Sequence, residues 1–389
     1  MKKFLMLCSL LLVAAALVTG SIAFFTDSVE SAENVIASGN IDIRQHEYER
    51  VEKNGAYTGQ VQPYTQDKGI YPSMIDGGAA RKAITVDGVT VDMYDETVPG
   101  FVDKIVNVEN TGRNIAYVRT FVAIPAQQGE DWLHMDKNPD ANWQWSAAII
   151  ENQQINGLSY DIHMATYLQQ LQPGQITSPV ILGFHLDGGV DHKNDHLTYQ
   201  GKPVFDMKND LSILVYTEAS QAIVFDDAHD GLNTSFGVFE NGHHPWSQVT
   251  MAKTQAELDA ALAAAKYNTE IALMNGAYTL PAVLPDGVRL VGWGSRVDLS
   301  CDAGLSAYDV EIEHARIAGP LTFTGHGSFQ HVVFDGALSA SLNKDSVFCC
   351  CQFRSDSQVT GPQVSFANCT ILSGCTGLEG IPGVEVAGQ

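Results

Sequence analysis

The chain has 389 residues, so we expect two domains and enough length to bury a sizeable core. Its formal net charge of -23 gives a surface that repels phosphate backbones, which argues against nucleic acid as a partner. The acidity favours solubility and divalent cations, but it does not identify a partner.

The first 23 residues have the pattern of a secretory signal. Lys2 and Lys3 precede an apolar stretch, and the small residues Ser21 and Ala23 stand where a signal peptidase needs them. We therefore expect cleavage between Ala23 and Phe24, and contact with the membrane only through the uncleaved signal. A membrane anchor is the alternative, although the apolar stretch is short for a span of about 20 residues.

Residues 24–237 contain short alternating strands with turn signals between them. A hairpin is predicted at Asp87 and Gly88, and a second one around residues 110–112, within "VENTGRN". This pattern predicts an antiparallel β-sandwich, jelly-roll-like in its connections. Trp132, Trp143 and Trp145 are expected to pack down a long surface excursion rather than to bind a ligand. Tyr117, Arg119 and Phe121 share one strand face and are expected to pack and pair within the sandwich, with subunit contact as the alternative.

Residues 238–250 are rich in Gly, Asn, His and Pro and predict a linker, and 251–389 differ from the first domain. The stretch "TQAELDAALAAAK" predicts a helix, because Thr254 and Glu257 have the spacing of a capping box. Apolar strands then recur about every 16 to 22 residues, which predicts a parallel solenoid of about six coils. The fold class expected is thus all-β, a sandwich followed by a short right-handed parallel β-helix with an N-terminal capping helix.

The segment "FFTDSVESAENVIASGNIDI" resembles the mature start of TasA/camelysin-like exoproteins of Firmicutes, which a SipW-type signal peptidase releases. The matching positions are Phe25 to Asp27, Asn34, and Gly39 to Ile43. Three later segments are similar to the same family: "VPGFVDKIVNVENTGRNIAYVRTFVAI", "LQPGQITSPVILGFHLD" and "AIVFDDA". The resemblance covers roughly residues 1–236.

This resemblance implies a secreted structural or adhesive protein on the surface, or in the extracellular matrix or biofilm, of a Gram-positive bacterium. Its partners would be further copies of the chain or other matrix proteins, besides the signal peptidase. Assembly would proceed by strand addition, in which the new N-terminal segment pairs with a neighbouring subunit. The residues of this assembly strand would be Phe24, Phe25, Thr26, Asp27, Ile41 and Ile43.

The C-terminal part, from "TQAELDAALAAAK" to "GAYTLPAVLPDGVRLVGWGS", resembles the cap and first coils of pectin-lyase-like β-helices, so carbohydrate binding or carbohydrate-active chemistry is an alternative function. Alternation places Asp309, Glu311 and Glu313 on one strand face, where they could hold calcium or divide acid and base roles. Their predicted neighbours on adjacent coils are Asp298, Asp302 and Asp335. An exposed acidic face is ordinary in a protein of this charge, so we favour a function other than catalysis.

The camelysin resemblance also implies a metalloprotease. The one His-x-x-x-His is His192 to His196, which lacks the Glu of zinc proteases and falls in a predicted polar loop. His243 and His244 fall in the predicted linker, and a solvated loop is the simpler interpretation of both pairs. We therefore expect no metal site and no cofactor, with calcium as the alternative.

Export permits disulfides, and six cysteines follow residue 300. The stretch "SVFCCCQF" predicts Cys349 and Cys351 on one strand face, stacked inward with Cys369. A disulfide and a metal–thiolate site are the alternatives. Asn368 could join a buried amide ladder in the solenoid.

Overall fold

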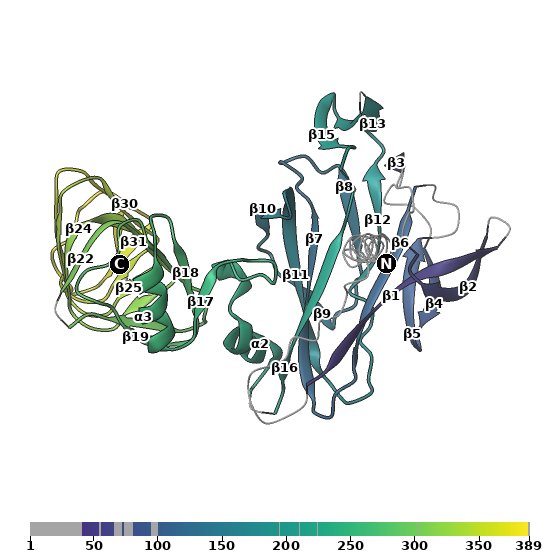
Figure 1. Ribbon diagram of the computed structural model, residues 1–389, viewed down its shortest axis with the longest axis horizontal. Helices are drawn as coiled ribbons and strands as arrows, with labels where there is room; N and C mark the ends of the chain where they lie inside the picture. The colour runs from purple at the N-terminus through teal and green to yellow at the C-terminus, as the bar shows by residue number, and fades with distance from the viewer. Residues whose placement is uncertain are drawn as a thin grey trace, which may run out of the picture. The chain divides into compact units, whose positions relative to one another are not determined.

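The computed structural model describes residues 41–53, 56–65, 72–73, 81–94, 100–193, 195–209, 211–223, 225–302 and 304–387. The chain is predominantly β, with 55% of its residues in strands, and it divides into two compact units between Leu232 and Asn233 (Figure 1). Within those ranges no helix has the length and apolarity needed to cross a membrane. The predicted signal and residues 24–40 lie outside the described residues.

The first sheet of the first unit is antiparallel except at one edge, where β3 joins β12 in parallel. Strands follow the order β2-β1-β6-β12-β3, and β8 also pairs with β12. The bounds are β1 Ile43–Lys53, β2 Ala56–Pro63, β3 Pro72–Ser73, β6 Val102–Asn110, β8 Leu133–Lys137 and β12 Ile181–Asp187.

The second sheet of this unit is antiparallel throughout and has the order β10-β11-β7-β16, with β9 on β11. The bounds are β7 Ala116–Pro125, β9 Trp143–Trp145, β10 Ile150–Ile155, β11 Leu158–Leu171 and β16 Leu214–Gln221. Two smaller sheets accompany these two: β4 Arg81–Val86 with β5 Val89–Tyr94, and β13 Val190–Lys193 with β14 His196–Tyr199 and β15 Lys202–Asp206.

One core cluster receives apolar side chains from both large sheets, because inward-facing residues alternate along their strands. Val106 and Ile181 come from the first sheet, and Val118, Val122 and Ala165 come from the second. The jelly-roll connectivity stays a prediction.

Packing of the predicted aromatic and charged side chains is confirmed. Arg119 is buried beside Glu218 on the neighbouring strand, with its Nε donating to Glu218 Oε2 at 2.7 Å. Trp132 and Trp143 are buried, and Trp145 is half-buried.

Of the two predicted hairpins, one is confirmed and one is wrong. The β4–β5 hairpin turns at Asp87 and Gly88, whose φ angles of 48° and 81° are those of a tight two-residue turn. Residues 110–112, in contrast, connect β6 to β7, which belong to different sheets. The Asn110 side chain explains this crossing, because its Nδ2 donates to the carbonyls of Asn114 and Leu171, both at 2.8 Å.

The division between the two units falls inside helix α2 (Ala228–Phe236). After α2, the second unit contains the short helix η1 (Phe239–Asn241), β17 (Thr250–Ala252) and helix α3 (Gln255–Ala264). The predicted capping box is present: Thr254 accepts the Glu257 N–H at 3.3 Å, and the Glu257 carboxylate accepts the Thr254 N–H at 3.0 Å. Leu258 and Leu262 of α3 pack into the solenoid core.

The remainder is a right-handed β-solenoid of about 8 turns, with two parallel sheets. The first sheet contains β17, β18 Glu270–Leu273, β20 Arg289–Gly292, β22 Leu305–Glu313, β24 Leu321–Gln330, β26 Leu338–Leu342, β27 Ser346–Cys349, β29 Gln358–Thr360 and β30 Val364–Ala367. The second contains β19 Gly276–Thr279, β21 Val297–Ser300, β23 Arg316–Ile317, β25 Val333–Phe334, β28 Gln352–Phe353, β31 Cys369–Leu372 and β32 Val384–Ala387. The β-helix is thus confirmed, but it has more turns than the roughly six expected.

The predicted linker is not a solvated segment. His243 and His244 are buried, and the His243 ring meets Trp293 of the same unit edge-on at 5.3 Å. Residue 250, where the linker was predicted to end, already begins β17.

Candidate functional site

The structure separates the three predicted carboxylates of β22. Asp309 has a left-handed φ of 55°, and the pairing of β22 with β24 shifts register between Ala307 and Val310. Such a bulge re-aims the extra side chain. Asp309 therefore does not lie in one row with Glu311 and Glu313, as simple alternation predicted.

Glu311 and Glu313 are engaged in ion pairs. Arg289, on the adjacent coil, contacts Glu311 and Glu313 and also Glu270, the last at 2.5 Å. Carboxylates that share one guanidinium are not presented as a separate acid and base. The arrangement favours a structural ladder of charges over a catalytic pair.

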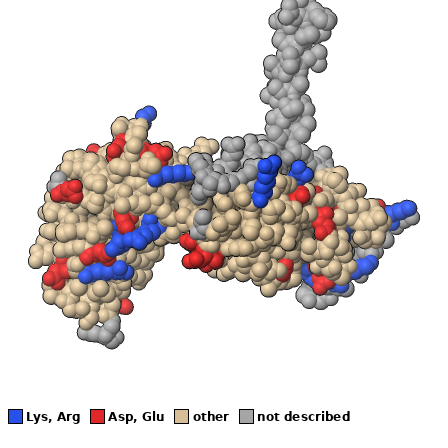
Figure 2. Space-filling model, turned by 90° about the horizontal axis from the view of Figure 1, so that it is seen from below, with Lys and Arg blue, Asp and Glu red and all other residues tan. Residues whose placement is uncertain are grey.

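A second ladder uses the other predicted acidic residues on the second solenoid sheet. Arg316 contacts Asp298 at 3.0 Å and also Asp335, which Arg354 contacts at 3.2 Å. Acidic and basic side chains are interleaved on the solenoid surface shown in Figure 2. Asp302 is exposed in the turn after β21 and belongs to neither ladder among the described residues.

Asp309 instead forms a small cluster at one corner of successive coils, which we name the Tyr–Asp corner: Tyr267, Tyr308, Asp309 and His326. Tyr267 Oη donates to Asp309 Oδ2 at 3.3 Å, and His326 Nε2 bonds to Asp309 Oδ1. The Tyr308 ring meets the His326 ring edge-on at 5.7 Å. The corner thus holds one carboxylate between Tyr267 and His326, with the Tyr308 ring against that histidine.

The aromatic rings of this corner face solvent, whereas the histidine beneath them does not. Tyr267 is 62% exposed and Tyr308 is 45% exposed, but His326 is only 5% exposed. The hydrogen bond from His326 lowers the pKa of Asp309, which keeps the carboxylate ionised at neutral pH. Gly287 makes room for the corner, since a Cβ there would come within 2.5 Å of the Tyr267 ring.

Sequence reasoning missed Tyr267, Tyr308 and His326. A signal was present, because Asn268, Gly287 and Asp309 recur about once per coil and each has a left-handed φ. A residue type that tolerates a left-handed φ, repeated once per coil, indicates a corner of the solenoid. Side chains next to that corner on successive coils lie close enough to contact one another.

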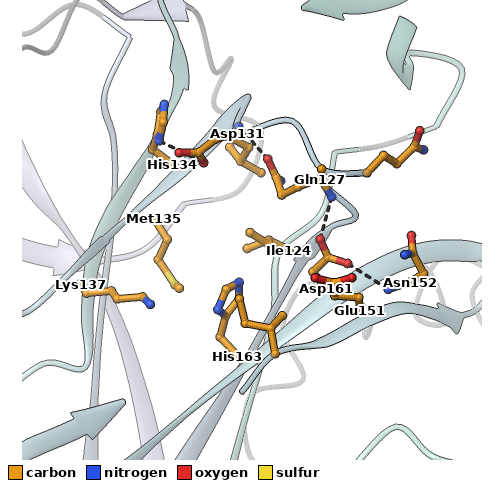
Figure 3. Close-up of a pocket in the computed structure, with 14 residues that line it drawn as sticks. Ile124, Gln127, Asp131, His134, Met135, Lys137, Glu151, Asn152, Asp161 and His163 are labelled. Atoms are coloured by element: carbon orange, nitrogen blue, oxygen red, sulfur yellow. Dashed lines mark hydrogen bonds and ion pairs between the residues drawn. The ribbon is translucent and has the colours of Figure 1, made fainter. Parts of the chain in front are cut away.

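A cleft of about 610 Å³ opens in the first unit, between β8 of one large sheet and β10 and β11 of the other. Its lining mixes charged and apolar side chains, as Figure 3 shows. Asp161 accepts the backbone N–H of Gln127 at 2.7 Å and that of Asn152 at 2.9 Å. This carboxylate is therefore held in place by the turn after β7 and by β10.

The imidazole of His163, in the cleft, is held neutral. Burial, and then the charge of Lys137, lower the pKa of His163 to about 4. At the rim, His134 lies 3.3 Å from Asp187 and 3.4 Å from Asp131 and stacks on His185 at 4.8 Å. Burial lowers the pKa of His185 to about 4 as well.

The predicted His192–His196 pair lies in a hairpin of β13 and β14 and not in a polar loop. His196 pairs with Lys193, and His192 pairs with Leu197, so the two imidazoles are not cross-strand partners. Among the described residues, no group of three or more His, Cys, Asp or Glu side chains is arranged to hold a metal ion.

The cysteines differ from the expectation in one respect. Cys351 and Cys369 are buried in the solenoid core, as predicted, and the hydrogen bond to Cys369 together with burial raises the pKa of the Cys351 thiol. Cys350 turns the chain with a φ of 57°, so Cys349 does not share a face with Cys351. Its Sγ lies 3.3 Å from the Cys350 Sγ, and the described cysteines are free thiols.

Asn368 takes a left-handed φ of 53° and is exposed at the next corner. It therefore does not contribute to a buried amide ladder. The same conformation occurs at His314, His331 and Cys350, so these positions form a corner between the two solenoid sheets.

The predicted cleavage site and most of the assembly strand, from Ala23 to Asp27, lie outside the described residues. Ile41 and Ile43 are described, and both are buried in the core of the first unit. Ile43 begins β1, where it pairs with Asn110.

No protein-family model and no curated protein matches the sequence. Among solved structures, the catalytic domain of a GH87 alpha-1,3-glucanase in complex with nigerose matches 90% of this chain at 12% identity, with a TM-score of 0.19. This chain spans 66% of that chain. A single-residue variant of such a domain matches 86% of this chain at 11% identity, with a TM-score of 0.12 and 60% of that chain covered. Scores this low carry no argument about function.

Proposed function

We propose that the protein is an extracellular adhesive protein that binds carbohydrate at the Tyr–Asp corner of its β-helix. The observation that carries this proposal is the pair of exposed tyrosine rings, Tyr267 and Tyr308, beside the ionised carboxylate of Asp309. The proposal of secretion and of a surface or matrix location is supported by the signal-like first 23 residues and by the resemblance of residues 1–236 to TasA/camelysin-like exoproteins.

The chemistry of the corner suits a neutral sugar. An aromatic ring offers an apolar face on which the C–H face of a pyranose can stack, and its hydroxyl supplies a polar edge. A carboxylate accepts hydrogen bonds from sugar hydroxyls, and bonds to an ionised acceptor are stronger than neutral ones. Its hydrogen bonds to Tyr267 and His326 fix the Asp309 carboxylate before any ligand arrives.

Binding is favoured over carbohydrate hydrolysis by the ion pairs described above. A glycosidase needs two carboxyl groups with separated roles. Glu311 and Glu313 share Arg289, and Asp309 points elsewhere on its bulge. The cluster therefore supports recognition of a sugar better than cleavage of one.

A glycan array probed with the chain from residue 24 onward tests the proposal. We expect binding to a restricted set of neutral glycans, and we expect Tyr308→Ala to weaken binding of the best glycan about tenfold in calorimetry. Met251→Ala is the matched control, because Met251 is 44% exposed on β17 of the same unit and lies outside the corner. Retained affinity in Tyr308→Ala, or an array without any bound glycan, would overturn the proposal.

We also propose that the protein assembles by donating its N-terminal strand, as the family resemblance implies. Because Ile41 and Ile43 already belong to the core of their own unit, the donated segment would be the residues before them. This assembly would present many copies of the sugar site, and multivalency raises the avidity of weak sites.

A further inference from the structure

The cleft of the first unit has an unusual lining for its position. Along β8, Leu133 and Met135 face the core between the two large sheets, and Lys137 continues this row at the rim of the cleft. Along β11, Ala165 belongs to the same core, and alternation places His163 and Asp161 in its row. Lys137, His163 and Asp161 thus occupy positions where the alternation along β8 and β11 predicts apolar side chains. Polar residues at such positions are informative about function.

One end of the cleft offers hydrogen-bond donors, the amine of Lys137 and the neutral imidazole of His163. The described residues include no carboxylate within ion-pair distance of Lys137, whose Nζ lies over the Trp145 ring at 4.4 Å. The charge of Lys137, after burial, contributes to the low pKa of His163. A carboxylate placed between the amine and the imidazole would accept hydrogen bonds from both.

The opposite end of the cleft offers acceptors. Asp161 is fixed by two backbone N–H groups, and Glu151 and Asn152 of β10 lie beside it. Figure 3 shows Lys137 and Asp161 on opposite sides, with Met135, Ile124 and His163 between them. Between Lys137 and Asp161, Met135 and Ile124 thus supply an apolar floor beside the His163 ring.

We propose that this cleft binds a small sugar acid of the hexuronate class. Its carboxylate would lie against Lys137 and His163, its hydroxyls would donate to Asp161 and Glu151, and its ring would rest on Met135 and Ile124. A volume of about 610 Å³ lies within the usual range for small-molecule sites and admits a single sugar ring with bound water. This site is separate from the Tyr–Asp corner, and neither proposal depends on the other.

Calorimetry with the chain from residue 24 onward tests this site, using glucuronate and glucose as matched probes. The two sugars differ in the carboxylate, so we expect glucuronate to bind and glucose to bind at least about tenfold more weakly. Equal binding of the two sugars, or no binding of glucuronate at millimolar concentration, would show the proposal to be wrong whatever happens to any variant.

Variants locate the site. Lys137→Met removes the charge and keeps the length of the side chain, and we expect it to weaken glucuronate binding about tenfold, with a similar loss in His163→Gln. Lys208→Met is the control, because Lys208 is exposed in a turn after β15 and does not line the cleft. Circular dichroism of each variant checks the fold. A folded Lys137→Met protein that binds glucuronate like the unmodified chain would refute the assignment.

Discussion

At the scale of single residues, the most informative side chains are polar groups that the fold holds in an unusual state. Asp309 has a left-handed backbone and an ionised carboxylate, and His163 has a neutral imidazole at the edge of a core. Strain and perturbed titration tend to concentrate at functional positions. Both residues lie in the sites proposed above, one in each unit.

The low pKa of His163 predicts an acid-sensitive first unit. The pKa in the folded state, about 4, lies below the unfolded value of 6.5, so the unfolded chain binds more protons between these two pH values. The stabilising contribution of the neutral imidazole is fully present above pH 6.5 and is lost as pH falls toward 4. The facing charges are Lys137, which opposes protonation, and Asp161, which favours it.

Urea unfolding at pH 7.0 and pH 4.5 measures this effect. We expect His163→Gln to reduce the loss of unfolding free energy between the two pH values by about 1 to 3 kcal/mol, a range that allows for solvent screening. His229→Gln is a control, since His229 is half-buried on helix α2, bonds to Gln144 and does not line the cleft. An equal pH dependence in His163→Gln and the unmodified chain would contradict the prediction.

At the scale of elements, local signals succeeded where one short segment decides the structure. The Asp87–Gly88 turn and the capping box of α3 need only neighbouring residues, and both were predicted correctly. The turn signal at residues 110–112 gave a wrong prediction of a hairpin, because the Asn110 side-chain amide donates to the carbonyl of Leu171, which is far away in the sequence. No local pattern shows that partner.

In the solenoid, too, local sequence patterns did not show contacts between residues on different coils. Alternation predicted one acidic row on β22, but a bulge, set by pairing with β24, separates Asp309 from it. The number of coils was underestimated because strands such as β23 and β28 contain only two residues each. Strands this short have no detectable period, so the second sheet was only partly visible in the sequence. The Tyr–Asp corner depends on that coil register and was missed with it.

The cap of helix α3 gives a prediction at this scale. Thr254→Ala removes the acceptor for the Glu257 N–H and breaks the reciprocal bond, which we expect to lower the unfolding free energy of the second unit by about 1 kcal/mol. Thr322→Ala is the comparison, because Thr322 is exposed on β24 and its side chain caps no helix. Chemical denaturation followed by far-ultraviolet circular dichroism provides the measurement. Equal stability of the two variants would show that the capping box contributes little.

At the scale of the whole molecule, the sequence predicted a β protein with a C-terminal right-handed solenoid, and the structure confirms this. The chain divides into two units between Leu232 and Asn233, and the predicted domain bounds stay a prediction. In the proposals above, the first unit carries the assembly strand and the sugar-acid cleft, and the second unit carries the Tyr–Asp corner.

Strand donation makes a prediction about the assembled protein. Unpaired strands add readily to the sheet edges of other chains, and backbone hydrogen bonds supply most of the affinity. A variant that lacks residues 24–36 keeps Ile41 and Ile43, so β1 and the core of the first unit should remain intact. We therefore expect this variant to stay monomeric in size-exclusion chromatography and to form no filaments in electron microscopy, whereas the chain from residue 24 onward forms them. Replacing residues 24–36 by a Gly/Ser segment of equal length should have the same effect as the deletion, because it keeps the spacing and removes the strand-forming sequence. Filaments from the deletion variant, or none from the full mature chain, would exclude assembly by this strand.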